Sequence, residues 1–217
     1  GVDLGGRRII KKKKKEVIVK HQHLIDSSNV LNELGLEKGK YIIVSAHREE
    51  NIDIEENFLN LMNSINAIAE KYQVPVIYST HPRSRKWIEK RNFKFHPLVK
   101  NTKPFGFFEY VKLQQNALCV LSDSGTLTEE SSILNFPAVL IRTSTERPEG
   151  LDAGSIIVGG IKEKDVLQAT ELAVSMFENN EPNGLSEYYD ITNTSLRVVK
   201  VIQSYAKIVK KTTWLEG

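Results

Sequence analysis

The sequence predicts an α/β fold built on a doubly wound parallel β-sheet of the Rossmann-like kind. Three observations predict it. Short apolar runs alternate with segments whose apolar residues recur every three or four positions, which is the pattern of strands followed by crossover helices. The apolar runs do not alternate with polar residues, as is typical of buried parallel strands. A chain of 217 residues is also long enough to bury one large core.

Six short runs are the expected strands, because each is mainly apolar and is bounded by polar or turn-forming residues. They lie at 41–45, 74–79, 93–95, 118–122, 138–141 and 156–158. The segments between them carry an apolar stripe and are the expected helices. These lie at 30–34, 58–69, directly after 81–83, and at 110–116, 126–134, 163–177 and 195–210. Gly35 follows the first helix and suits its C-cap.

The charge of the chain is unevenly distributed. The formal net charge is +3, but the first twenty residues carry a local +6, which leaves −3 on the rest. We therefore expect residues 1–15 to be a disordered basic tail or an extension foreign to the natural protein. Residues 16–217 are then the folded domain, with a terminal helix. The acidic balance of this body argues against a nucleic-acid partner; an RNA- or membrane-binding arm stays a minor alternative for the tail.

Hydropathy and cysteine content indicate a cytoplasmic protein without a membrane partner. No run approaches the roughly 20 apolar residues of a membrane-spanning helix, and no secretory signal precedes the fold. The single cysteine, Cys119, cannot form an intrachain disulfide, which fits a reducing compartment. Because it lies within an apolar run, we expect it in the core, with a reactive thiol as the less favoured alternative.

Ligands of such sheets bind outside the carboxyl ends of the strands, so the polar loops at these ends are the candidate site. The first loop, 45–51, is Ser-Ala-His-Arg-Glu-Glu-Asn. Charged groups gain little there unless they meet a ligand or each other. His47 is therefore expected to contact phosphate or uracil, and Arg48 to fix the loop or bind substrate; a solvated loop with internal ion pairs is the alternative. In the second loop, His81 could cap the following helix or touch the ligand.

The third segment carries Asp-Ser-Gly-Thr from the end of a strand into a helix. The start of a helix presents unpaired N–H groups and a positive dipole end, which together bind anions. Gly125 lets the backbone turn closely, and Ser124 and Thr126 add hydroxyl donors, so a pyrophosphate could be held there without lysine. Glu130 is expected to bind the hydroxyls of a ribose; a favourable interaction with the helix dipole alone is the alternative.

The fourth loop, 142–150, contains two arginines after the next strand. A guanidinium matches phosphate oxygens bidentately, so Arg142 and Arg147 are expected to clamp the phosphates. An internal ion pair between Glu146 and Arg147 is the alternative.

Several well-known motifs do not occur in the sequence. It has no G-x-x-x-x-G-K-[ST] loop and no G-x-G-x-x-G fingerprint, which disfavours an ordinary NTPase or dinucleotide site. It also has no H-E-x-x-H motif, no paired C-x-x-C and no G-x-S-x-G elbow. These absences give no support to a zinc site or to a serine-hydrolase site.

Taken together, the four loops resemble those of the non-hydrolysing UDP-N-acetylglucosamine 2-epimerases. The match runs from about residue 30 to the C-terminus. It is most specific in the HRxEN-like loop at 47–51, and in DSG-x-x-x-EE followed by TERPE at 123–130 and 145–149. The amino-acid sequences of 45–51, 102–110 and 123–132 look closest to those of the branch that makes UDP-N-acetyl-L-fucosamine from UDP-2-acetamido-2,6-dideoxy-L-talose.

The resemblance implies one half of a two-domain GT-B fold that grips the UDP of a UDP-activated amino sugar. In the family reaction, UDP leaves the anomeric carbon while a base takes the proton of carbon 2. The glycal then takes UDP back, with a proton on the opposite face. The resemblance therefore implies that no cofactor and no metal is required. By position, His47 would contact the diphosphate, Ser124 and Gly125 would donate to it, Glu130 would bind ribose and Arg147 would neutralise charge. His47 and Arg147 are thereby the candidate catalytic residues.

Two departures limit this carry-over. Thr126 stands where many relatives have a second glycine. The family's acid/base carboxylates belong to an N-terminal domain absent from this chain, so no proton-transfer residue is assigned, and the chain alone is expected to turn over nothing. The expected partners are that domain and, because relatives tend to be dimers, a second copy. A UDP-sugar glycosyltransferase of the same fold and a non-catalytic nucleotide-sensing module stay open as alternatives.

Overall fold

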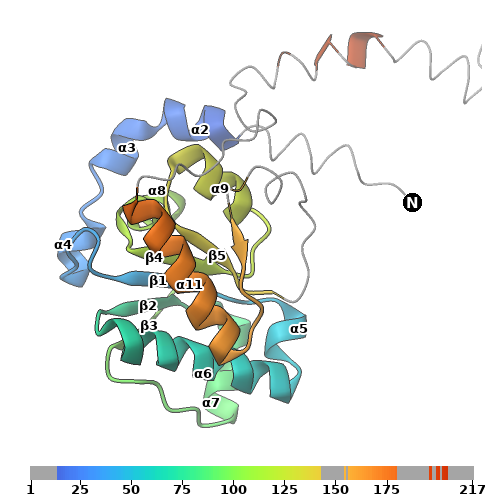
Figure 1. Cartoon of the computed structure of the whole chain (residues 1–217). Helices are drawn as coiled ribbons and strands as arrows, with labels where there is room; N and C mark the ends of the chain where they lie inside the picture. The colour runs from blue at the N-terminus through green and yellow to red at the C-terminus, as the bar shows by residue number, and fades with distance from the viewer. Residues whose placement is uncertain are drawn as a thin grey trace, which may run out of the picture. The chain divides into compact units, whose positions relative to one another are not determined.

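The computed structural model describes residues 14–142, 154, 156–179, 196, 199–200 and 202–204 (Figure 1). The chain separates into two compact units, one of residues 23–186 and one of residues 1–22 with 187–217. In the second unit, helix α2 (Lys14–Lys20) begins inside the expected tail, most of which lies outside the described residues. The helix expected at 195–210 is described only at 196, 199–200 and 202–204, which are helical.

The larger unit is built on a sheet of six strands in the order β3-β2-β1-β4-β5-β6. Every neighbouring pair is parallel. The strands are β1 Ile42–Ser45, β2 Val76–Ser79, β3 Val99–Thr102, β4 Cys119–Ser122, β5 Ala138–Leu140 and β6 Ile157–Val158. The strand order reverses between β1 and β4, where Ser45 pairs with Ser122. The predicted doubly wound sheet is confirmed, and its switch point lies between these two strands.

Helices cover both faces of this sheet. They are α3 Gln22–Asp26, α4 Val30–Leu34, α5 Glu49–Ile52, α6 Glu55–Tyr72, α7 Pro82–Lys90, α8 Phe107–Asn116, α9 Leu127–Leu134 and α11 Glu163–Glu178. Gly35 caps α4 with a left-handed backbone of φ 62°, as expected of a helix-ending glycine. The short helix α5 was not expected, because the loop after β1 has no apolar periodicity.

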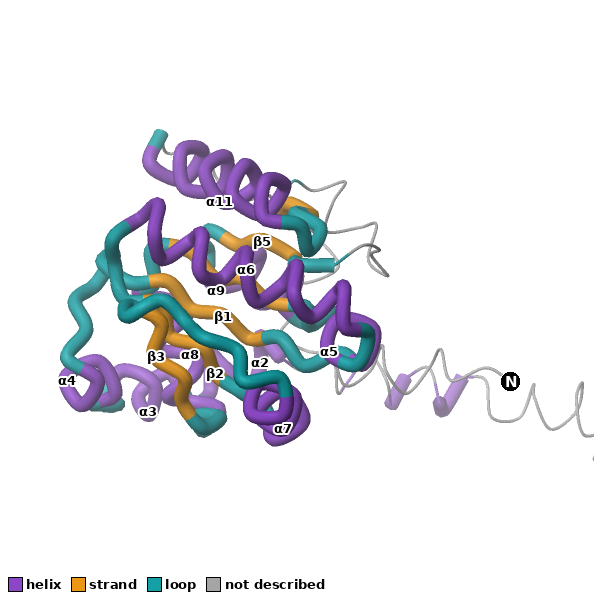
Figure 2. Tube along the Cα trace, turned by 90° about the horizontal axis from the view of Figure 1, so that it is seen from below, coloured by secondary structure: helices purple, strands orange, loops and turns teal. Residues whose placement is uncertain are grey.

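The two faces of the sheet have separate hydrophobic cores. Ile42 and Val44 of β1 pack with the apolar stripes of α6 and α11. Ile43, which points the other way, packs with residues of α4, α8 and α9. Figure 2 shows α6 and α11 on one side of the sheet and α8 on the other. Because both faces are buried, consecutive strand residues must all be apolar, which explains the continuous runs in the sequence.

The strand predicted at 93–95 is wrong. These residues lie in a loop. Phe93 and Phe95 pack edge to face, with ring centroids 5.2 Å apart, and Phe93 also packs on Phe58 of α6 at 6.0 Å. The third strand instead comes later, as Val-Lys-Asn-Thr at the edge of the sheet, and Val99 is the one buried residue of its four. A half-exposed edge strand needs few apolar residues, so β3 carries no apolar run.

The expected core position of Cys119 is confirmed. Its side chain is fully buried in β4, and burial raises the pKa of its thiol to about 12. The thiolate is the reactive form, so the native protein is expected to resist alkylation by iodoacetamide at neutral pH. Mass spectrometry should show one modification in denaturant and almost none without it. Equal labelling rates in both conditions would contradict the buried position.

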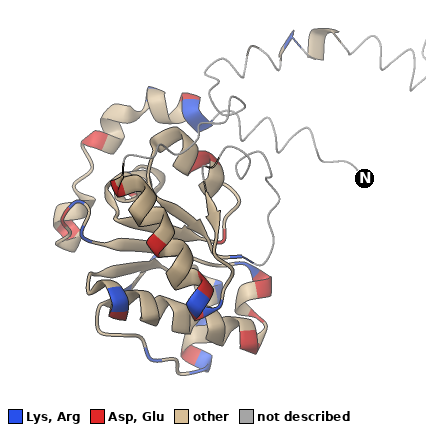
Figure 3. Cartoon of the chain, viewed as in Figure 1, with Lys and Arg blue, Asp and Glu red and all other residues tan. Residues whose placement is uncertain are grey.

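None of the described helices is long and apolar enough to cross a membrane. Figure 3 shows acidic and basic residues interspersed along α6, α7 and α11. Such mixing is typical of helix faces that meet water.

Candidate functional site

A buried carboxylate joins the loops that follow β1 and β4. Asp123 is fully buried, and its Oδ2 accepts the backbone N–H groups of His47 and Arg48, each at 2.8 Å. The Nδ2 of Asn51 donates to the same oxygen at 3.3 Å, and Arg48 Nε donates to the carbonyl of Asp123 at 2.9 Å. The first loop is thus folded around Asp123, whose side chain was not among the predicted site residues. The contact from Arg48 Nε ties this loop to the residue that directly follows β4.

The same loop is also tied to β5. Asn51 is 1% exposed and donates to the carbonyl of Ile141, just after β5, at 3.2 Å. Part of the stretch forms the short helix α5, whose Glu49 and Glu50 are exposed and form ion pairs with Arg83 and Arg142. The carboxyl ends of β1, β4 and β5 are therefore held together by Asp123 and Asn51.

His81 lies beside His47 at this end of the sheet. It is the N-cap of α7, and its Nδ1 accepts the backbone N–H of Arg83 at 3.3 Å, so the capping role is the one that the structure shows. The rings of His47 and His81 have centroids 5.7 Å apart.

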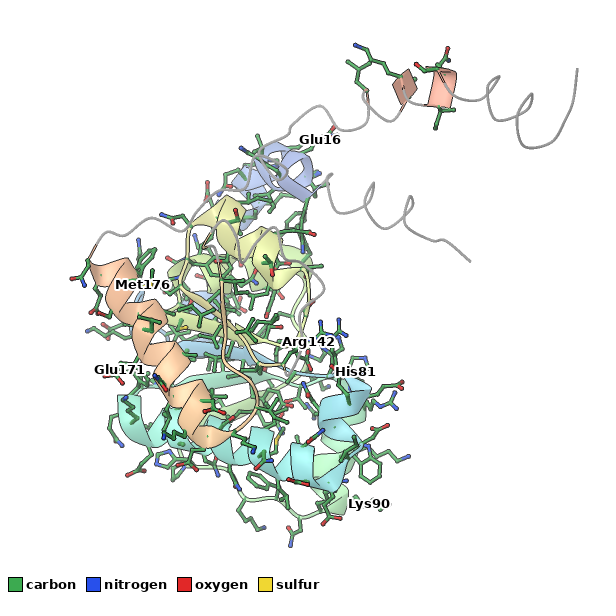
Figure 4. All side chains as sticks on the ribbon, turned by 45° about the vertical axis from the view of Figure 1, so that its right-hand side comes forward. Glu16, His81, Lys90, Arg142, Glu171 and Met176 are labelled. Carbon is green, nitrogen blue, oxygen red and sulfur yellow. The ribbon has the colours of Figure 1, made fainter. Side chains whose placement is uncertain are left out.

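Figure 4 shows His81 and Arg142 on the same side of the molecule, with Lys90 at the far end of α7. A pocket of about 430 Å³ is lined by His47, Arg48, Glu49, Glu50, His81 and Arg83.

The start of α9 carries two hydroxyls, as predicted. The Oγ of Ser124 lies 3.0 Å from the Oγ1 of Thr126 and 3.4 Å from its backbone nitrogen. Thr126 precedes the helix and makes no side-chain cap of its own, and Gly125 lies in the turn between the two. Both hydroxyls therefore sit at the positive end of the helix dipole, where an oxyanion is stabilised.

Glu130 lies in the first turn of α9 and is 8% exposed. Its Oε2 accepts a hydrogen bond from Nε2 of Gln114 in α8 at 2.6 Å. Burial raises the pKa of Tyr110, and the nearby carboxylate of Glu130 raises it further. The hydrogen bond between Gln114 and Glu130 joins α8 to the first turn of α9.

Of the two predicted arginines, the structure describes only Arg142. Arg142 is 2% exposed, and its Nε lies 3.6 Å from Oε1 of Glu50 in α5. It does not line the pocket that contains His47 and His81. Arg147 lies outside the described residues.

Within the described part of the chain, no group of three or more His, Cys, Asp or Glu side chains could hold a metal ion.

An ion-pair network that the sequence did not reveal forms one wall of the pocket. Arg83 of α7 donates to Asp53 through Nε at 3.1 Å and Nη2 at 2.6 Å, and to Glu49 Oε1 through Nη1 at 2.6 Å. Trp87 Nε1 also donates to Asp53 Oδ1 at 3.0 Å. These contacts fasten α5 to α7, and so hold the His47 loop beside His81.

This network predicts a pH dependence of stability. The hydrogen bond from Arg83 lowers the pKa of Asp53 below its ordinary value of 3.8. A lowered folded-state pKa contributes stability above the ordinary value, and this contribution is lost as the pH falls below it. The free energy of unfolding lost in Asp53→Asn, measured by urea denaturation, should therefore be largest near neutrality and shrink below pH 3.8. A loss that is equal at pH 7 and pH 3 would contradict the pairing.

The fold and these contacts define a Rossmann-like domain with two hydroxyls at a helix start and a histidine at the switch point of its sheet. A family model described as UDP-N-acetylglucosamine 2-epimerase matches residues 9–203. The chain therefore belongs to the UDP-N-acetylglucosamine 2-epimerase family.

Individual relatives agree with this assignment. A UDP-N-acetylglucosamine 2-epimerase homolog of Methanococcus maripaludis is 36% identical over 192 residues, covering 83% of this chain and 50% of the relative. The structure of the Rickettsia bellii epimerase is 34% identical with a TM-score of 0.79, covering 93% and 54% of the two chains. That of the Methanocaldococcus jannaschii epimerase in complex with UDP-GlcNAc and UDP is 25% identical with a TM-score of 0.75, covering 88% and 52%. The chain spans about half the length of these relatives.

Proposed function

We propose that this chain is the nucleotide-holding half of a UDP-N-acetylhexosamine 2-epimerase that works by elimination and re-addition of UDP. One observation carries the proposal. Asp123 bonds the His47 loop and directly precedes Ser124, so the histidine and the two hydroxyls of the α9 start meet at the switch point. A diphosphate seated on this helix start would lie within reach of His47, whose side chain is 46% exposed.

The proposed chemistry requires such a site. UDP leaves the sugar as an anion, and fixed donors stabilise the charge that develops on it. His47 and Arg147 would supply cationic donors, Ser124, Gly125 and Thr126 would hold the phosphates, and Glu130 would bind ribose. Arg48, His81 and Arg142 would shape the loops around the substrate. We place the carboxylates that move the carbon 2 proton in a further domain of a GT-B pair, outside these 217 residues.

The proposed substrate is a UDP-activated N-acetyl amino sugar. The M. jannaschii relative was solved with UDP-GlcNAc and UDP, which supports either UDP-GlcNAc or a close analogue. The amino-acid sequences of segments 45–51, 102–110 and 123–132 favour conversion of UDP-2-acetamido-2,6-dideoxy-L-talose to UDP-N-acetyl-L-fucosamine. The enzyme would then be a cytoplasmic homodimer that makes precursors of capsule or lipopolysaccharide.

Calorimetry with UDP tests the nucleotide site. The chain is expected to bind UDP weakly, and His47→Ala or Arg147→Ala should each weaken binding by about 10–100-fold, because each removes a charge-assisted hydrogen bond. His96→Ala is the matched control, since His96 lines a different pocket between α6 and α11. It should bind UDP as the unchanged chain does.

Two outcomes would count against the proposal. Unchanged UDP affinity in both His47→Ala and Arg147→Ala would remove the site assignment. Detectable epimerisation by the 217-residue chain alone would show that the proton-transfer groups lie within it. In the complete enzyme, exchange of the carbon 2 proton in deuterated water indicates an epimerase, whereas transfer to an acceptor without exchange indicates a glycosyltransferase.

A further inference from the structure

The two carboxylate oxygens of Asp123 have very different surroundings. Oδ2 accepts from His47 N, Arg48 N and Asn51 Nδ2. Oδ1 has no hydrogen-bond partner among the described residues, although the side chain is fully buried. A buried oxygen without a donor is costly, and native proteins keep few of them. A hydrogen-bond donor placed at Oδ1 would therefore stabilise the site.

The imidazole of His47 can supply that donor. Its Nδ1 lies 3.4 Å from Oδ1 of Asp123, slightly too far for a well-formed hydrogen bond. The backbone N–H of His47 is already bonded to the other oxygen of the same carboxylate, so the residue that carries the ring is held beside Asp123. Hydrogen bonds of this kind are often long in a free site and shorten when the ligand binds. The other neighbours are engaged elsewhere: Arg48 Nε donates to the carbonyl of Asp123, and Asn51 Nδ2 donates to Oδ2.

We propose that Asp123 is a positioning residue that orients His47 for the diphosphate, an inference that rests on the proposed function. Oδ1 holds the neutral imidazole with its proton on Nδ1, so that Nε2 is the nitrogen presented to the ligand pocket. When an anionic diphosphate binds, Nε2 takes up a proton from solvent and donates it in a hydrogen bond to a phosphate oxygen. The imidazolium then lies between two anions, with the carboxylate stabilising its charge from behind.

The need for a carboxylate distinguishes this role from simple loop anchoring. An asparagine at position 123 would still offer one carbonyl oxygen to the N–H groups of His47 and Arg48. Its other group would be an amide NH₂, which faces His47 Nδ1 as a donor and so needs Nδ1 as an acceptor. Asp123→Asn should therefore keep the loop and invert the tautomer of His47.

Nitrogen NMR of the imidazole rings tests this directly in the unliganded chain. Long-range ¹H–¹⁵N spectra of the chain labelled at its five histidines report which ring nitrogen carries the proton. The His47 signals are identified by their loss in His47→Ala. We expect the Nδ1–H form at neutral to mildly alkaline pH in the unchanged chain, and the Nε2–H form in Asp123→Asn. UDP affinity should fall on the order of tenfold in Asp123→Asn, as for other losses of an orienting partner.

Each outcome decides the proposal. An Nε2–H form in the unchanged chain would overturn it, even if Asp123→Asn does not fold. A folded Asp123→Asn, judged by its backbone amide spectrum, that keeps the Nδ1–H form would also overturn it. The expected tautomers combined with no UDP binding would support the orienting contact and reject the proposed function instead, so the two failures are distinguishable.

Discussion

Replacing Phe58 with alanine is expected to lower the free energy of unfolding by about 3–5 kcal/mol, the usual cost of deleting a buried aromatic ring. Phe58 is fully buried on the inner face of α6. Its ring packs edge to face on Phe93, and the guanidinium of Arg91 lies 4.5 Å from its centroid. The substitution would therefore leave a cavity between α6 and the loop that leads to β3. Urea denaturation at neutral pH measures the loss.

The adjacent Leu59→Ala is the matched control. Leu59 occupies the next position of the same helix but is 40% exposed, so its truncation should cost less than about 1 kcal/mol. Equal losses for the two variants would mean that α6 does not pack on the sheet as described. A loss only at Phe58 supports the packing of the core that faces α6 and α11.

Replacing Glu130 with glutamine is expected to weaken UDP binding by about 10–100-fold, because a hydrogen bond to a charged acceptor contributes roughly 1.5–3 kcal/mol. The variant keeps an oxygen that can accept from Gln114, so the contact between α8 and α9 should survive. Calorimetry should be run with UDP and with 2′,3′-dideoxy-UDP. The dideoxy ligand has no hydroxyl to lose, so its affinity should differ little between the variant and the unchanged chain.

The comparison of the two ligands separates recognition from stability. Equal weakening of both ligands would mean that Glu130 supports the fold of the site and does not bind ribose. Unchanged affinity for UDP would remove Glu130 from the site altogether. Thermal unfolding of both proteins checks that any change in affinity is not a loss of folded chain.

The buried strands could be predicted from the sequence, because a strand covered on both faces must be apolar throughout. The edge strand β3 could not, since Val99 is the one buried residue among its four. The aromatic residues Phe93 and Phe95 suggested a strand, but they form a small cluster against α6 and β2 instead. Aromatic side chains bury well in loops too, so their presence does not by itself identify a strand.

The candidate site could be predicted in part. Its location followed from the rule that ligands bind at the carboxyl ends of strands, and His47, His81 and Ser124 do lie there. The role of Asp123 could not be predicted, because it depends on β4 lying next to β1. The pairing of Arg83 with Asp53 likewise joins two loops that only the folded sheet brings together. Such contacts leave no mark in local spacing.

The place of β1 at the centre of the sheet also matters while the chain is being made. β1 pairs with β2, which follows soon after, but its other edge waits for β4, which begins only at Cys119. At roughly 5–20 residues per second, synthesis needs about 4–15 seconds to travel from Ser45 to Cys119. During that interval, the nascent chain on the ribosome exposes an unpaired apolar strand edge, which is prone to aggregation. Early binding by a chaperone would protect it until β4 emerges.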